Sequence, residues 1–121
     1  MGEGILWLIG TVIYRMTCGW SVVIRVDFCD PTVGRPHGLF YGAILNDENG
    51  QRILGLDNSH AFDNAQPDDP FDHEHLPGKV GQRFPYVFKN PNQLVSDIFD
   101  RVEAHCHNTG TPFEFEGDGD E

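Results

Sequence analysis

The residues best suited to chemistry are two histidines in the run Asp72-His73-Glu74-His75. In an extended chain, alternate side chains project to the same side, so both imidazoles can reach one substrate or one ion. Imidazole has an unperturbed pKa of about 6.5, so a neutral ring can accept a proton while a protonated ring donates one. This pairing suits metal-independent RNA cleavage, in which the ribose 2′-hydroxyl attacks the adjacent phosphate.

The same run has two other interpretations. One is a divalent cation site, because imidazole nitrogens and carboxylate oxygens are common metal ligands. Its candidate ligands are His60, Asp72, His73 and His75. The other is an acidic surface loop whose histidines cap local backbone groups. The spacing leaves all three interpretations open.

Residues outside this run extend the candidate site. Asp57 ends an apolar run and precedes Asn58, which a simple turn also explains because Asp and Asn hydrogen-bond their own backbone. If Asp57 instead joins the histidines, the intervening stretch must fold back as a compact loop. The candidate catalytic set is His73, His75, Asp72, Asp57 and His37. The candidate phosphate contacts are Arg52, Lys79 and Arg83, which flank the acidic stretch at its two ends.

Strands must position these side chains. Apolar runs rich in β-branched and aromatic residues are separated by turn signals at Cys18-Gly19 and Asn49-Gly50, and the second is a strong hairpin signal. Pro85 confines the last run to a sheet edge or a strand start. Strands are predicted at residues 5–17, 20–29, 37–45, 51–57 and 84–88.

A helix is predicted at residues 91–107. Asn90 is a suitable N-cap, Pro91 suits the first helical position, and Gln93 completes a capping box. The apolar residues that follow share one helical stripe, namely Leu94, Val95, Ile98, Phe99, Val102 and Cys106. The expected fold class is α+β, a four- or five-stranded antiparallel sheet with one C-terminal helix packed on one face.

The 121 residues suit one domain. We expect a single α+β domain over 1–108, with a long acidic loop containing histidines at 61–82, and a disordered acidic tail at 109–121. The net charge of −11 disfavours non-specific binding to a phosphate backbone. Three cysteines without a C-x-x-C pair fit a reducing cytoplasm. We expect no membrane segment and no cofactor, since no nucleotide-binding or zinc-finger motif is present.

Five pieces of the chain, in order, resemble one family. They are Gly34-Arg35-Pro36-His37 followed by Tyr41, Leu56-Asp57-Asn58, Asp72-His73-Glu74-His75, Tyr86-Val87-Phe88, and Leu94 through Glu103. Together they look like the TumE-type toxins of bacterial toxin–antitoxin pairs. The resemblance implies an α+β domain, a helix-turn-helix antitoxin as partner and RNA as the target. It also adds Tyr86 to the candidate substrate contacts.

The functional expectation is therefore a toxin-like component of a bacterial toxin–antitoxin pair. In the enzymatic version it is a metal-independent endoribonuclease, with His73 and His75 as base and acid. The alternative is a non-enzymatic, acidic protein-binding module, an inactive family member that engages a basic partner. Relatives tend to have basic residues at two positions where this chain has Phe40 and Gly55, which keeps that alternative open. A homodimer is a further expectation.

Overall fold

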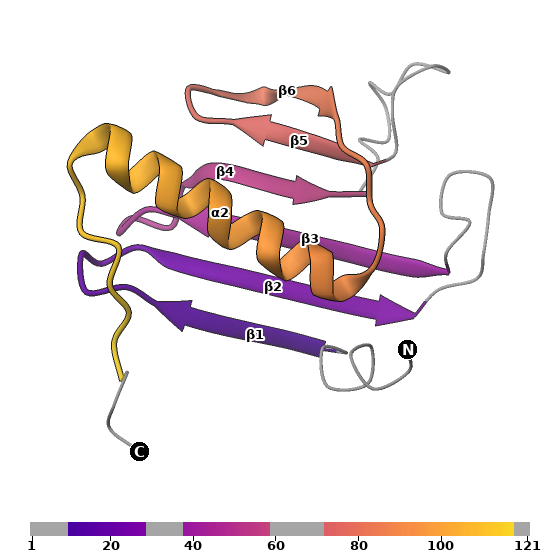
Figure 1. Cartoon of the computed structure of the whole chain (residues 1–121), viewed down its shortest axis with the longest axis horizontal. Helices are drawn as coiled ribbons and strands as arrows, with labels where there is room; N and C mark the ends of the chain where they lie inside the picture. The colour runs from indigo at the N-terminus through magenta and orange to yellow at the C-terminus, as the bar shows by residue number, and fades with distance from the viewer. Residues whose placement is uncertain (1–9, 29–37, 59–71, 118–121) are drawn as a thin grey trace.

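The computed structural model describes residues 10–28, 38–58 and 72–117. Six strands form one antiparallel sheet in chain order, and the long helix α2 lies across one face of it (Figure 1). The strands are β1 (Gly10–Arg15), β2 (Ser21–Phe28), β3 (Leu39–Asn46), β4 (Arg52–Asp57), β5 (His73–Leu76) and β6 (Lys79–Pro85), and the helix is α2 (Pro91–Thr109). The expected α+β class, antiparallel sheet and C-terminal helix are confirmed.

The expected number of strands is wrong, because the sheet has six. The strands β5 and β6 form a hairpin that begins inside the expected loop 61–82 and extends beyond it to Pro85. Its tight turn uses Gly78, whose positive φ of 77° suits glycine. The predicted strand at 84–88 is displaced, since β6 ends at Pro85 and the chain then leaves the sheet.

The core lies between the sheet and α2. Alternate residues of β2 are buried, and each faces a buried residue of β3 across the register, such as Ile24 opposite Ala43 and Val26 opposite Tyr41. From the other side, α2 contributes Leu94, Ile98, Val102 and Cys106, all fully or almost fully buried. Burial of this apolar area drives the helix onto the sheet.

The ends of α2 follow its caps. The Asn90 side chain accepts a hydrogen bond of 2.8 Å from the Gln93 amide, as the capping box predicts. At the other end Gly110 has a φ of 70° and donates to carbonyls of the last turn. The helix therefore reaches Thr109, slightly beyond the predicted end at 107.

The first part of the acidic tail differs from the expected disorder. The backbone of residues 114–116 pairs with the end of β1: Thr17 N donates to Glu114 O at 3.0 Å, and Glu116 N donates to Arg15 O at 2.7 Å. Phe113 and Phe115 pack against the core. Two aromatic anchors thus hold a strongly acidic segment against the sheet, and composition alone did not indicate this.

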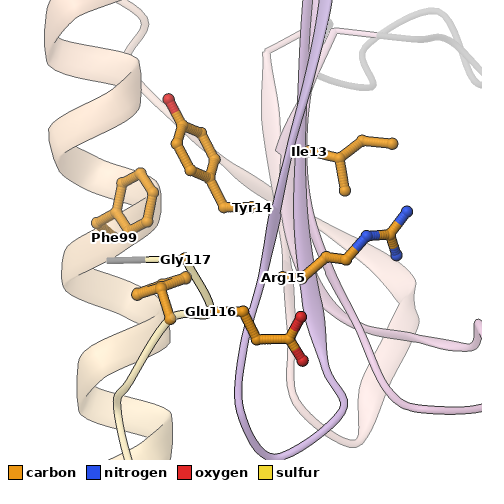
Figure 2. A pocket seen from close by; sticks show the side chains of 7 residues that line it. Ile13, Tyr14, Arg15, Phe99, Glu116 and Gly117 are labelled. Carbon is orange, nitrogen blue, oxygen red and sulfur yellow. The ribbon is translucent and has the colours of Figure 1, made fainter. Parts of the chain in front are cut away.

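This segment closes a pocket of about 580 Å³ between β1, α2 and the tail. Figure 2 shows Tyr14 directed towards α2 and Phe99, whereas Ile13 and Arg15 project from the other side of β1. None of the candidate site residues that the structure describes lines this pocket. Within the described ranges, no helix is both long enough and apolar enough to cross a lipid bilayer.

Candidate functional site

Three buried polar side chains, those of Asp57, His73 and His75, converge where β4 meets β5. Asp57 faces His73 directly across the strand register. His73 Nε2 lies 2.6 Å from Asp57 Oδ1, and His75 Nε2 lies 3.6 Å from Asp57 Oδ2. The two imidazoles meet edge to face with their centroids 4.9 Å apart. One carboxylate therefore serves both rings, and we call these residues the Asp–His–His cluster.

The cluster lies on the sheet face opposite α2. On the helix side, Leu56 is paired with Glu74, whose carboxylate receives hydrogen bonds from Arg101 Nε at 2.8 Å and Nη2 at 3.2 Å. Since neighbouring strand residues alternate between faces, the residues on each side of Glu74 must point away from the helix. The Glu74–Arg101 ion pair thus fixes the direction in which both imidazoles project.

Asn58 holds the end of β4 in place. This fully buried side chain accepts a hydrogen bond from Tyr41 N at 3.0 Å and donates one to Leu39 O at 2.8 Å. The amide thereby continues the pairing of β3 with β4 just beyond Asp57. From the sequence, a turn is one explanation of Asp57 and Asn58 and a place for Asp57 in the site is the other, and neither assigns this role to Asn58. The only signal for it is an amide directly after a buried strand.

Two glycines border the cluster. Gly42 faces Asp57 across the register, and Gly55 faces His75. A Cβ at position 42 would lie 3.9 Å from Asp57 Cβ, and one at position 55 would lie 3.3 Å from Ala43 O. Because both residues are glycines, neither position places a side chain beside the carboxylate or the imidazoles.

The Asp57 carboxylate is kept ionised. Burial alone would raise its pKa, but hydrogen bonding to the two imidazoles and their charge lower the pKa well below the usual range of a carboxyl group. The Arg52 guanidinium lies 3.8 Å from Asp57 Oδ2 and has a third of its side chain exposed, at 33%. The cluster therefore couples a fixed negative charge to two groups that can carry a proton.

The other predicted residues that the structure describes are separated from the cluster or only border it. Asp72 accepts a hydrogen bond of 2.8 Å from the Tyr41 hydroxyl, so it braces the chain just before β5 instead of joining the cluster. Tyr86 donates to Asp97 Oδ2 at 2.6 Å beneath α2, and burial raises the pKa of its phenol, so it anchors the helix. His37 and His60 lie outside the described residues.

The two basic residues on β6 differ in position. Lys79 is exposed at the start of the strand, after the hairpin turn. Arg83 lies two residues before Pro85, which is the register partner of His73. Strand alternation therefore places Arg83 on the cluster's face of the sheet. Arg52 and Arg83 are thus the predicted phosphate contacts that lie on this face.

A family model described as toxin TumE matches residues 10–105, a span from the start of β1 to the last turns of α2. No curated protein and no solved structure matches the chain.

Proposed function

The chain belongs to the toxin TumE family, and from that premise we propose that it is the toxin of a bacterial toxin–antitoxin pair and cleaves RNA without a metal ion. The observation that carries the proposal is the Asp–His–His cluster. It combines two imidazoles, the groups best suited to proton transfer near neutral pH, with a carboxylate that orients them.

The reaction needs one base and one acid. A neutral imidazole takes the proton from the ribose 2′-hydroxyl, whose oxygen then attacks the adjacent phosphorus. The bond from phosphorus to the 5′-oxygen breaks, and an imidazolium gives that oxygen its proton. The products are a 2′,3′-cyclic phosphate and a free 5′-hydroxyl, and the two rings have exchanged protonation states.

The geometry suggests different roles for the two rings. The 2.6 Å contact binds His73 closely to Asp57, whereas His75 lies at 3.6 Å from the same carboxylate. We therefore assign His75 as the acid that releases its proton to the leaving oxygen, and His73, oriented by Asp57, as the base.

Phosphate binding falls to the two arginines on the same face. Guanidinium groups bind phosphate oxygens bidentately, and Arg52 and Arg83 flank the cluster from β4 and β6. The net charge of −11 repels the rest of an RNA chain, so these residues must act at a defined phosphate and not across a basic surface. Exposed Lys79 is a more distant candidate.

Membership of this family implies an antitoxin as partner. We propose that the antitoxin is a helix-turn-helix protein and that the pair acts in the cytoplasm, where its RNA target would be. A homodimer stays a prediction from the sequence.

A second function is favoured by one observation, the net charge of −11. A strongly acidic protein can act without catalysis by occupying a basic partner. In that case the Asp–His–His cluster would be a structural element, and replacing its imidazoles would leave the biological effect intact.

Expression in a bacterial host separates the two functions. We expect the chain to stop growth and degrade cellular RNA, and His73→Asn and His75→Asn each to abolish both effects. His107→Asn is the matched control, because His107 is exposed on the last turn of α2. If the two cluster variants accumulate as folded protein and still stop growth while RNA stays intact, the protein acts as a binding module and the enzymatic function is wrong.

A further inference from the structure

The donor atoms of the Asp–His–His cluster form a compact set. One nitrogen from each imidazole and one oxygen from Asp57 all lie within 4.8 Å of one another. Their side chains are between 1% and 8% exposed. Burying three polar groups together is costly unless they bind one another or a shared ligand.

The spacing of these atoms fits a small ion. Zinc lies about 2.0–2.2 Å from imidazole nitrogen and carboxylate oxygen, so tetrahedral ligands are about 3.3 Å apart. The two contacts of the cluster, 2.6 Å and 3.6 Å, lie on either side of that value. The separations among the three donor atoms are at most 4.8 Å, so the donors must approach one another by up to about 1.5 Å to bind one ion.

The type of ligand selects the class of ion. Imidazole nitrogen is a borderline ligand that suits Zn²⁺ and its neighbours in the first transition row, whereas Mg²⁺ and Ca²⁺ prefer oxygen ligands. The two imidazoles therefore favour a Zn²⁺-type ion, and the carboxylate adds one oxygen ligand that such an ion also accepts. Arg52, at 3.8 Å from Asp57 Oδ2, can hold the carboxylate in place from outside the cluster. Within the described part of the chain the cluster supplies three protein ligands, and Zn²⁺ takes a fourth ligand to complete a tetrahedron.

We propose that Asp57, His73 and His75 bind a single Zn²⁺-type ion, and that this ion switches the toxin off. Binding replaces the hydrogen bond between Asp57 and His73 and occupies the nitrogen lone pairs of both rings. Neither ring can then accept or release the proton that RNA cleavage needs. The metal site stands on the geometry alone, whereas its inhibitory effect rests on the proposed function.

The binding arm uses the purified full chain and does not depend on activity. Titration with Co²⁺, a spectroscopic substitute for Zn²⁺, should give visible d–d absorption that saturates at one equivalent, and Zn²⁺ should displace it. Thiolate charge-transfer bands should be absent, which excludes the cysteines as ligands. We expect Asp57→Asn and His75→Asn to weaken Zn²⁺ binding by about 100-fold or more, because even outer-shell partners are worth about 10- to 100-fold.

His107→Asn serves again as the control and should bind Zn²⁺ like the unaltered chain. Circular dichroism without metal shows whether each variant is folded. If a variant is unfolded, the Co²⁺ titration of the unaltered chain still shows whether the chain has one metal site. Absence of saturable absorption at one equivalent, or the presence of thiolate bands, overturns the site.

The activity arm measures RNA cleavage by the same samples with chelator and with one equivalent of Zn²⁺. Cleavage in chelator that falls at least tenfold when Zn²⁺ is added supports both the inhibition and the proposed function. Stoichiometric binding combined with cleavage only in the presence of metal retains the site but overturns the inhibition and the metal-independent mechanism. Cleavage in chelator without metal binding overturns this inference and leaves the proposed function standing.

Discussion

At the scale of single residues, Asp57 links the chemistry to the stability of the fold. Its buried carboxylate lies between two imidazoles and an arginine, which compensate its negative charge. The same contacts that orient the imidazoles therefore make the folded state sensitive to protonation of this one group.

A pH titration of stability tests this link. Because the folded-state pKa of Asp57 is lowered, its contribution to the free energy of unfolding is fully present above the unfolded pKa of about 4 and is lost as the pH falls towards the folded pKa. We expect chelator-treated wild type to lose stability below about pH 4 more steeply than Asp57→Asn in urea denaturation. Parallel curves for the two proteins would show that the carboxylate is not stabilised by the histidines.

Asn58 is the second residue whose substitution should lower the stability of the fold. Asn58→Ala leaves Tyr41 N and Leu39 O buried without their partner, so we expect the free energy of unfolding to fall by about 1–3 kcal/mol. Asn92→Ala, at an exposed position of α2, should change it by less than about 0.5 kcal/mol. If the two substitutions change the free energy of unfolding equally in urea denaturation, Asn58 does not stabilise the end of β4.

At the scale of elements, the cluster depends on how β5 sits between β4 and α2. The side chain of Glu74 reaches Arg101 on the helix side, and Arg101 also lies over the Tyr86 ring with its Cζ 5.6 Å from the centroid. This contact ties a four-residue strand to a long helix. The positions of His73 and His75 therefore depend on a residue that lies on the other face of the sheet.

A double-mutant cycle measures this tie. We expect Glu74→Gln and Arg101→Gln to show a coupling energy of about 1 kcal/mol, reduced from that of a buried pair because Arg101 is a third exposed. The cycle for Arg25 and Asp27, whose ion pair is more exposed, should give a smaller value. A coupling energy near zero for Glu74 and Arg101 would mean that other contacts set the direction of β5.

The tail supplies a further prediction at this scale. Phe115 meets the rings of Tyr14 and Phe99 edge to face, with centroids 6.5 Å and 5.5 Å away. We expect Phe115→Ala to lower the free energy of unfolding by about 1–2 kcal/mol, less than for a fully buried phenylalanine. Val87→Ala, at a residue that is 73% exposed, is the control. A melting temperature unchanged by Phe115→Ala would restore the interpretation of this tail as disordered.

The elements also show what the sequence could and could not predict. The four strands β1 to β4 and the helix followed from alternation, from Asn49-Gly50 and from the capping box, because these signals are local. Strand β5 has no local signal of this kind, because it buries two imidazoles where a typical strand buries apolar side chains. Its register is set by pairing with the neighbouring strands. The alternation of His73 and His75 predicted a shared side, but the approach of Asp57 depends on the pairing of β4 with β5.

At the scale of the whole molecule, charge and architecture restrict the ways in which the protein can meet RNA. A net charge of −11 opposes association along a nucleic-acid backbone. In the proposed reaction, Arg52 and Arg83 therefore have to offset this repulsion at one phosphate. Activity should therefore depend on a few local contacts and be specific to the attacked linkage.

The central claim is that the Asp–His–His cluster cleaves RNA by acid–base chemistry. The most direct measurement is cleavage of a defined single-stranded RNA by the purified chain in excess chelator, with identification of the new ends. The account predicts a 2′,3′-cyclic phosphate and a 5′-hydroxyl, no cleavage at a linkage whose 2′-hydroxyl is replaced by hydrogen, and a rate at least about 100-fold lower for folded His75→Asn. Cleavage of the deoxy linkage, or an undiminished rate for His75→Asn, would contradict it.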